Sequence, residues 1–565
     1  MSTPRTGPVA GIVAFLPKAS DFDLRHVRVD LLAGITVAFV ALPLALGFGV
    51  TSGAGATAGI ITAIVAGFVA ALMGGSSFQV SGPTGAMTAV LLPIVAQHGT
   101  TALPILCVMA GVILVLLGIA RVGQYVRFIP WPVVTGFTNG IGVIIFLQQL
   151  PNVLGVPQPH GESIVTIAYV SVREWLSSPG FTSILLAILA ITVMVGWRRI
   201  KALSLVPASM AALIVVSLAS LLPVFGEVAR IGVIPRSLPL PQLPTLGFTD
   251  AWVDLARAAL AIAVLSALES LLSAVVADGM TVGEKHDPDR ELFGQGLANV
   301  AAGLFGGLPA TAALARTAVN VRSGAKTRLA SMTHAVTLLV VILFLAPLAS
   351  RIPLAVLGGI LMVVAVRMVE AHATGLILKS TKSDAFVMVL TMVVTIAFDL
   401  ILAIEVGLVA AAILFIVRMS STFTVDAMSL AGPELKPLVS DVGAAELDLL
   451  KGRVVAFRVE GPIFFGAAER FIDQLLKIDQ GIEIVVLRLR RVPVLDATGV
   501  TALRAIHDRL GSRGIDLIIS GLQPQPATVL KRTGVYDEIT EGGRNDIALT
   551  ENAIAEAKRR LLAAS

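Results

Sequence analysis

The sequence contains few charged residues for its length. Only 14% of its 565 residues are charged and 56% are hydrophobic, whereas a soluble protein of this size carries about 25% charged residues. The mean hydropathy is +0.88. This composition excludes an ordinary soluble protein and indicates that most of the chain lies in a lipid bilayer.

Cysteine is almost absent as well. The single cysteine, Cys107, lies inside an apolar run, which excludes an intramolecular disulfide framework and a thiolate metal cluster. The sequence also lacks a nucleophile–base pair, a metal-ligand cluster and a Walker loop, so we expect neither an enzyme nor a cofactor. The first 30 residues lack the ordered regions of a signal peptide. We expect them to form a cytoplasmic segment before the first span.

The charge that is present is concentrated near the C-terminal end. Residues 430–565 hold 18 of the 42 basic and 18 of the 37 acidic residues. We therefore predict an N-terminal segment (1–30), a transmembrane domain (31–420) and a soluble domain (421–565). The rest of the chain is net basic, as expected when basic loops orient a membrane domain. The pI near 9.5 is then no sign of nucleic-acid binding.

Apolar runs of roughly 20 residues are long enough to cross a bilayer as helices. The sequence predicts eleven good spans. They cover residues 31–50, 56–73, 102–120, 131–150, 181–197, 203–224, 251–277, 329–350, 353–369, 385–398 and 401–417. Four segments are weaker or shorter: 164–176, 292–305 and the two stretches described below.

Basic loops give the expected orientation. The loops 196–203, 277–291 and 378–384 carry the charged turns, so we place them and the C-terminal domain in the cytoplasm of a cell whose inner membrane holds the spans. The C-terminal domain alternates strand and helix patterns, which predicts a small sheet covered by helices. The predicted strands are a pair within 453–466 and single strands at 482–489 and 515–522, and the predicted helices are 467–478, 498–514 and 525–534.

Two short stretches, 74–93 and 303–319, resemble one another. Each has Gly-Gly, a proline, small residues with threonine, and an apolar run too short to cross a bilayer. A helix that begins in mid-membrane leaves N–H groups unpaired, must face protein or water, and attracts anions. Interrupted segments at corresponding positions of two halves point to a transporter site. We predict that helices starting near Pro83 and Pro309 face a common anion.

Glu269 lies near the centre of the apolar run 258–277, where an ionisable residue costs at least ~2.5 kcal/mol and indicates a functional site. Ser273 shares its helix face. Burial favours the protonated carboxyl, which suits a residue that couples transport to protons; the alternative is a permanently paired carboxyl. Arg316, two turns beyond Pro309, has three possible positions: at the anion, paired with Glu269, or extended to the cytoplasmic face.

The sequence as a whole resembles the SulP (sulfate permease) family of anion transporters, and its C-terminal domain resembles a STAS domain. The STAS resemblance is carried by VEGPIFFGAAERF and LDATGVTALRAIHDRL. The membrane resemblance is carried by VALPLALGFGVTSG (40–53), GGSSFQVSGPTGA (74–86), ESLLSAVVADGMT (269–281), ELFGQGLANVAAGLFGG (291–307) and ARTAVNVRSGAKTRLA (315–330).

The resemblance implies an α-helical membrane fold of fourteen spans in two inverted repeats of seven, with half-helices at spans 3 and 10. A core bundle (spans 1–4 and 8–11) would move against a gate bundle (spans 5–7 and 12–14), in a homodimer with cytoplasmic α/β STAS domains. The implied anion site consists of Phe48, Pro83, Thr84, Ala313, Leu314, Ala315 and Arg316.

The resemblance also bears on the coupling ion. Sodium-coupled bicarbonate members have an acid and a hydroxyl in span 8 and a hydroxyl in span 10. Here span 8 has Glu269 and Ser273, but span 10 has Leu314 and Ala315, which favours H⁺ over Na⁺. Leu44 replaces a polar residue common in span 1, so that wall of the pocket is expected to be more apolar.

The STAS resemblance points to a helix start in the sequence DATG. Soluble relatives carry a phosphorylatable serine there, and this sequence has Asp496 and Thr498. We expect Thr498 to cap the helix, with phosphorylation as the alternative. A cytoplasmic protein partner of this domain is also possible.

We therefore expect a secondary active transporter that imports a small anion with H⁺. Bicarbonate and C4-dicarboxylates are preferred over sulfate. The alternatives are a Na⁺-coupled symporter and a membrane sensor whose STAS domain is the output.

Overall fold

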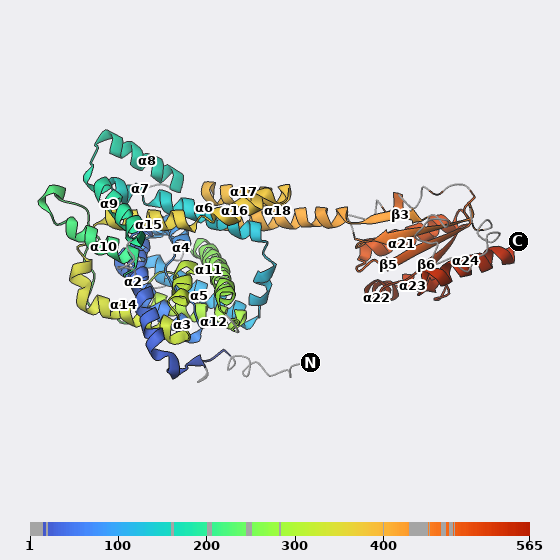
Figure 1. The fold of residues 1–565 in the computed structure, drawn as a ribbon, viewed down its shortest axis with the longest axis horizontal. Coiled ribbons are helices and arrows are strands. Elements are labelled where there is room, and N and C mark those ends of the chain that lie inside the picture. Colours follow the sequence, from blue (N-terminus) through green and yellow to red (C-terminus); the bar gives the residue numbers. More distant parts are fainter. Residues whose placement is uncertain are drawn as a thin grey trace. The chain divides into compact units, whose positions relative to one another are not determined.

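The structure is a computed structural model that describes residues 15–17, 21–159, 163–199, 206–244, 251–281, 284–398, 400–428, 450, 452–464, 471–473, 478 and 481–564. The chain divides into two compact units, Met1–Val409 and Ala410–Ser565. The first is helical and the second contains a five-stranded sheet (Figure 1). The finer division into residues 1–30, 31–420 and 421–565 stays a prediction.

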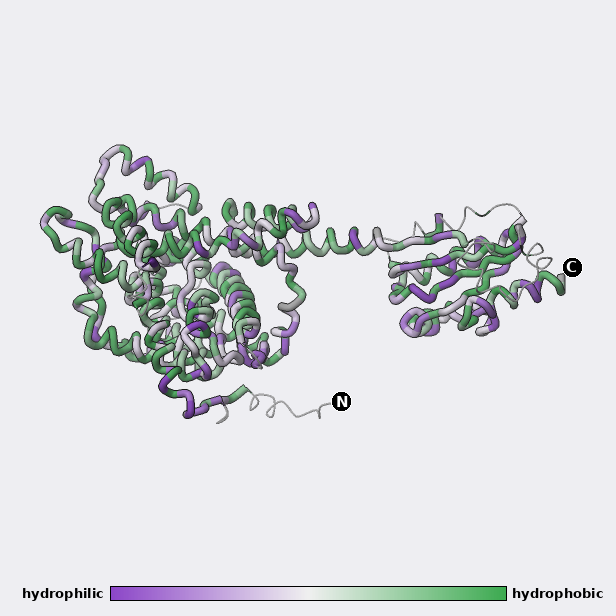
Figure 2. Tube along the Cα trace, viewed as in Figure 1, coloured by the Kyte–Doolittle hydropathy of each residue, from purple (hydrophilic) through white to green (hydrophobic). Residues whose placement is uncertain are grey.

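Eight helical segments of the described residues are long and apolar enough to cross a membrane, and Figure 2 shows hydrophobic residues along most of the first unit. Their helices are α2 (Val27–Thr51), α3 (Ala56–Met73), α5 (Leu103–Ile119), α6 (Trp131–Gln148), α7 (Leu150–Leu154), α11 (Trp252–Met280), α14 (Arg328–Ala349), α15 (Leu354–Met368), α16 (Ala371–Lys379) and α18 (Leu400–Ser421). The shorter helices are α4 (Gly85–His98), α8 (Ile164–Ser177), α9 (Thr182–Gly196), α10 (Ala208–Ala219), α12 (Pro288–Leu304), α13 (Leu314–Arg322) and α17 (Lys382–Ala397). The count of fourteen spans stays a prediction.

Helix boundaries differ from the predicted ones where a cap or a proline decides them. Helix α12 begins at Pro288, four residues before the predicted 292, because the Asp287 carboxylate accepts from the backbone N–H groups of Asp289 and Arg290, both at 3.1 Å. Helix α10 is shorter than the predicted 203–224. Pro223 begins a separate 3₁₀ turn, and residues 201–205 lie outside the described residues.

The membrane helices pack into two groups. In one group α14 lies against α2 and α3, and α12 lies against α3 and α5; in the other α15 lies against α6 and α9, and α17 against α6. Small residues permit close backbone approach between membrane helices. A Cβ atom on Gly59 would lie 2.1 Å from the Ala45 carbonyl oxygen, and one on Gly111 would lie 2.6 Å from the Gly296 carbonyl oxygen. Side chains at these glycines would force the helices of the first group apart.

The same order of elements occurs twice in the first unit. Helices α2 and α3 lead into the two-residue strand β1 (Ser81–Gly82) and α4, while α11 and α12 lead into β2 (Thr311–Ala312) and α13. Strands β1 and β2 pair antiparallel, with Ser81 opposite Ala312 and Gly82 opposite Thr311. The two interrupted stretches therefore lie side by side.

The second unit contains a sheet in the order β3-β4-β5-β6-β7, in which β3 is antiparallel to β4 and the other pairs are parallel. Its strands are β3 (Thr424–Met428), β4 (Val454–Glu460), β5 (Ile484–Arg491), β6 (Asp516–Ser520) and β7 (Asp546–Ile547). Its fully described helices are α21 (Ala497–Gly511), α22 (Pro524–Arg532), α23 (Val535–Thr540) and α24 (Thr550–Ala564). The sequence prediction missed β3, α23, β7 and α24, and most of the predicted helix 467–478 lies outside the described residues.

The N-cap of α21 is Asp496 and not Thr498, so the capping prediction for Thr498 is wrong. The Asp496 carboxylate accepts from the Gly499 N–H at 2.8 Å, while Thr498 lies in the first turn with an exposed side chain. Asp496 comes first in the chain and caps a helix as well as threonine does. Thr498 therefore remains only a candidate for phosphorylation.

Loss of the Asp496 cap is expected to destabilise the C-terminal domain. Asp496→Ala should lower its free energy of unfolding by about 1 kcal/mol, whereas Thr498→Ala should change it by less than about 0.5 kcal/mol. The urea midpoint for proteolytic cleavage within this domain measures both effects. Equal midpoints for the two variants would contradict the assigned cap.

Candidate functional site

The paired strands β1 and β2 place two helix starts next to one another. Helical hydrogen bonding begins with Thr88 N–H to the Thr84 carbonyl at 3.2 Å in α4 and with Thr317 N–H to the Ala313 carbonyl at 2.9 Å in α13. The N–H groups of the first turn of each helix thus have no partner within that helix. Their partial positive charge makes the space in front of them attractive to an anion.

The sequence prediction placed the two prolines at the first helical positions, but in the structure neither proline lies there. Helix α4 begins two residues after Pro83, and α13 begins five residues after Pro309. Between Pro309 and α13 the chain forms β2, whereas Pro83 follows β1 and is separated from α4 by Thr84 alone, whose backbone is extended. Beside Pro309, the Asn299 side chain holds Ala310, with Asn299 Oδ1 accepting from its N–H at 2.8 Å and Nδ2 donating to its carbonyl at 2.9 Å.

Arg316 lies in the first turn of α13, not two turns into it. Its side chain is 1% exposed, and Nη2 donates to the Pro83 carbonyl at 2.7 Å. This burial excludes the extended position at the cytoplasmic face. The guanidinium instead bridges the two interrupted stretches next to both helix starts.

Glu269 contacts the residue that precedes α4. Its Oε2 accepts from Thr84 Oγ1 at 3.0 Å, and the Arg316 guanidinium is close enough to attract it electrostatically. Among the described residues, no basic nitrogen lies within 4.0 Å of its carboxylate. The side chain is only partly buried, so the structure does not lock it into a permanent ion pair.

Ser273 does not join the Glu269 carboxylate. Its fully buried hydroxyl donates to Thr317 Oγ1 at 3.1 Å, and Thr317 Oγ1 also accepts from the Val80 N–H at 3.2 Å. These contacts fix α11 to α13 behind the helix starts. Thr317 was missed in the sequence, although a hydroxyl in the first turns of a half-helix was the signal that could have found it.

The remaining predicted site residues fall into two groups. Phe48 lies at the start of α4, since a Cβ on Gly85 would lie 3.2 Å from Phe48 Cε1; Leu314 and Ala315 are exposed at the start of α13. Ala313 differs, because its N–H donates to the Val80 carbonyl at 3.0 Å. That N–H is therefore not available to an anion.

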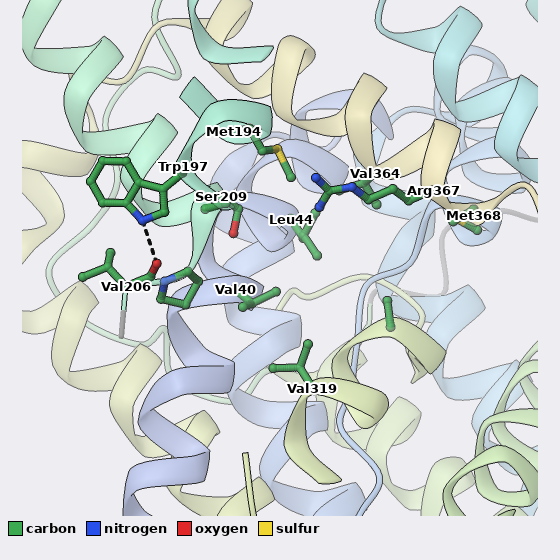
Figure 3. A pocket seen from close by; sticks show the side chains of 13 residues that line it. Val40, Leu44, Met194, Trp197, Val206, Ser209, Val319, Val364, Arg367 and Met368 are labelled. Carbon is green, nitrogen blue, oxygen red and sulfur yellow. Dashed lines mark hydrogen bonds between the residues drawn. The ribbon is translucent and has the colours of Figure 1, made fainter. Parts of the chain in front are cut away.

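A cavity of about 570 Å³ lies between the two helix groups, beside α13 (Figure 3). Its walls are mostly apolar, and they include Leu44, as the sequence suggested, and Ala315. Arg367 of α15 extends into it toward Leu44. Arg367 was not predicted as a site residue, because a basic residue near a helix end usually lies at the membrane surface. The cavity lining also includes Val40, Met194, Trp197, Ser209, Val319, Val364 and Met368.

Two apposed helix starts, a buried arginine and a cavity between two groups of membrane helices define a carrier of small anions. The chain belongs to the sulfate permease family, whose sequence pattern matches residues 27–391, and a STAS domain matches residues 450–556. The suggested family resemblance is therefore confirmed.

Relatives along nearly the full chain are transporters by name. The chain is 36% identical over 530 residues to the putative sulfate transporter YvdB of Bacillus subtilis, with 93% of this chain and 97% of that one covered. It is 34% identical over 541 residues to the bicarbonate transporter BicA of Synechocystis, with 92% and 93% covered. The expectation that the chain is no enzyme is confirmed by this family membership.

Solved structures support the fold. The transmembrane domain of a cyanobacterial bicarbonate transporter BicA matches with a TM-score of 0.62 at 36% identity, covering 68% of this chain and 98% of that one. A structure of SLC26A9 matches with a TM-score of 0.82 at 16% identity, covering 98% and 94%. The predicted class, a helical membrane transporter with a STAS domain, is thereby confirmed.

Proposed function

We propose that this SulP anion transporter is an H⁺-coupled importer of bicarbonate or a C4-dicarboxylate, with sulfate as a weaker substrate. It would lie in the cell's inner membrane as a homodimer, with its N-terminal segment and STAS domain in the cytoplasm. The observation that carries the proposal is that Arg316 and Glu269 lie together at the starts of α4 and α13, and that α13 lines the cavity with Ala315. A small anion there would contact first-turn N–H groups and the guanidinium, next to a carboxyl group that binds and releases a proton.

Proton coupling is favoured over sodium coupling by the oxygen atoms near Glu269. A bound metal cation in this region needs several oxygen ligands. The Ser273 and Thr317 hydroxyls are bonded to one another, and the exposed start of α13 offers the apolar side chains of Leu314 and Ala315. A proton needs only the carboxylate itself.

The two helix groups around the cavity support transport by alternating access. The helix starts belong to the group that contains α2, α3 and α11, whereas Arg367 belongs to α15 in the other group. A relative movement of the groups would expose the anion site to one side of the membrane and then to the other. The same groups would thereby act as the core and gate bundles.

Uptake by reconstituted vesicles tests the proposal. Labelled bicarbonate, succinate and sulfate are offered separately, with an imposed gradient of H⁺ or of Na⁺. We expect accumulation of bicarbonate or succinate driven by H⁺ alone. Accumulation driven only by Na⁺ would support the sodium-coupled alternative, and binding without flux of any of the three would support a sensor.

Arg367 is expected to raise the rate at which anions enter the cavity. Arg367→Gln should lower the initial uptake rate about three- to tenfold, because a charge in a low-dielectric cleft concentrates anions near the site. The rate of the variant should also depend less on ionic strength. Arg351→Gln, an exposed arginine just before α15, is the matched control, and equal rates for the two variants would contradict this role.

A further inference from the structure

His334 of α14 is a buried titratable residue for which the proposed transport step has no use. Its side chain is fully buried, and neither ring nitrogen has a hydrogen-bond partner within the described part of the chain. Buried polar groups in native proteins nearly always have a partner, and each exception needs an explanation. An apolar residue at this position would pack without that penalty.

A hydrogen bond joins α13 to α14 on the faces that carry Arg316 and His334. Asn320 Nδ2 of α13 donates to Ser331 Oγ of α14 at 3.1 Å, and only residues 323–327 separate the two helices. One turn back from Asn320 is Arg316, and one turn forward from Ser331 is His334. The Arg316 charge also acts electrostatically on the His334 ring.

One nitrogen of the Arg316 guanidinium has no hydrogen-bond partner among the described residues. Nη2 donates to the Pro83 carbonyl, while Nη1 has no partner among the residues described. Nη1 lies beside β1 and α3: a Cβ on Gly82 would lie 2.7 Å from Nη1 and 3.3 Å from the Cα of Ala63. Gly82 thus leaves room next to this nitrogen.

The His334 ring lies against the same two elements. A Cβ on Gly67 would lie 3.7 Å from His334 Cε1 and 3.2 Å from the Ser81 carbonyl oxygen. Gly67 is one turn from Ala63 on α3, and Ser81 precedes Gly82 in β1. The imidazole and the guanidinium therefore lie near neighbouring turns of α3, and one helical turn rises about 5.4 Å. Two hydrogen bonds through one water molecule span about this distance.

We propose that His334 positions Arg316 for anion binding through a water molecule shared by its imidazole and Nη1. A neutral imidazole offers one acceptor nitrogen, and arginine offers only donors. The water donates to the imidazole and accepts from Nη1. With Nη2 held by Pro83 and Nη1 by this water, the guanidinium plane is fixed, and its other N–H groups remain for the anion. The inference rests on the proposed function, which makes Arg316 an anion contact.

Replacement of His334 by leucine and by glutamine separates this role from a structural one. Uptake of labelled bicarbonate and sulfate by vesicles gives KM, maximal rate and pH profile. We expect His334→Leu to raise KM about tenfold with the maximal rate within about twofold, because binding and not translocation is weakened. His334→Gln keeps a donor and an acceptor, so its KM should stay within about threefold of the wild type. The pH profile should be unchanged in both variants.

Ser331→Ala is the control, since it lies one turn away on α14 and loses only the bond to Asn320. A purely structural role predicts that His334→Leu is as stable and as active as the wild type, because it removes an unpartnered polar group. A wild-type KM in His334→Leu therefore overturns the inference. A shifted pH profile in His334→Gln also overturns it, because His334 would then carry a proton.

The melting temperature in detergent checks the folding of each variant. If His334→Leu melts below the wild type, Gly67→Ala provides the same test, since its methyl carbon would lie 3.7 Å from the ring and fill the space for the water. A wild-type KM in Gly67→Ala then overturns the inference. Absence of flux in the wild type refutes the proposed function and the inference together, whereas flux with an unchanged KM refutes the inference alone.

Discussion

Glu269→Gln is expected to abolish proton-driven accumulation of the anion while anion exchange continues. Glutamine cannot take up a proton, but its amide oxygen can accept the hydrogen bond that Thr84 Oγ1 now donates to Oε2 at 3.0 Å. The pocket should therefore keep its shape. Accumulation against a gradient should fall at least about tenfold, and exchange of labelled for unlabelled anion across the vesicle membrane should fall less than about threefold.

The charges that face Glu269 define the controls. The Arg316 guanidinium attracts the Glu269 carboxylate electrostatically, and it also interacts electrostatically with the His334 ring. Arg316 and His334 therefore both keep their wild-type side chains in this experiment. Glu405→Gln alters an exposed carboxyl of α18 and should leave accumulation and its pH dependence as in the wild type. If Glu269→Gln loses exchange as well as accumulation, Glu269 shapes the pocket and does not couple anion transport to protons. If it loses neither, the proton is carried elsewhere.

The overall architecture was accessible from the sequence because membranes constrain it strongly. Backbone polar groups in lipid must be satisfied within a helix, so an apolar run such as 56–73 becomes the helix α3 with the same bounds. The two interrupted stretches were found by their shared pattern of glycine, proline and threonine. Their pairing as β1 and β2 was not predicted, since two residues are too few to show a strand period.

Parts of the site could not be predicted because they depend on contacts between distant segments. Arg316 and Pro83 are 233 positions apart in the chain, and only the crossing of β1 and β2 makes the arginine bridge them. The same crossing moved the start of α13 away from Pro309. Thr317 and His334 acquire significance only from what the folded chain places beside them, whereas Glu269 was recognisable because a carboxylate within an apolar run is costly.

Arg316→Gln is expected to lower the transport efficiency, the maximal rate divided by KM, at least about 100-fold. The change removes the positive charge at the helix starts and the bond from Nη2 to the Pro83 carbonyl, and a charge-assisted hydrogen bond contributes about 1.5–3 kcal/mol. Arg316→Lys keeps the charge but loses the planar fork, so we expect an intermediate loss of about tenfold. Uptake kinetics in vesicles measure both. Arg322→Gln, an exposed arginine at the far end of the same helix, should behave as the wild type.

The double variant Arg316→Gln/Glu269→Gln tests whether the two side chains act together. In the single variant Arg316→Gln, the Glu269 carboxylate loses the attraction of the guanidinium, and whenever it has released its proton it repels an incoming anion. Removal of both charges ends this repulsion, so anion exchange in the double variant should be faster than in Arg316→Gln alone. In free energy, the coupling between the two changes should exceed about 0.5 kcal/mol, the limit for independent sites. Additive effects would mean that Glu269 does not affect the binding of the anion at Arg316. The carboxylate would then lie outside the binding site.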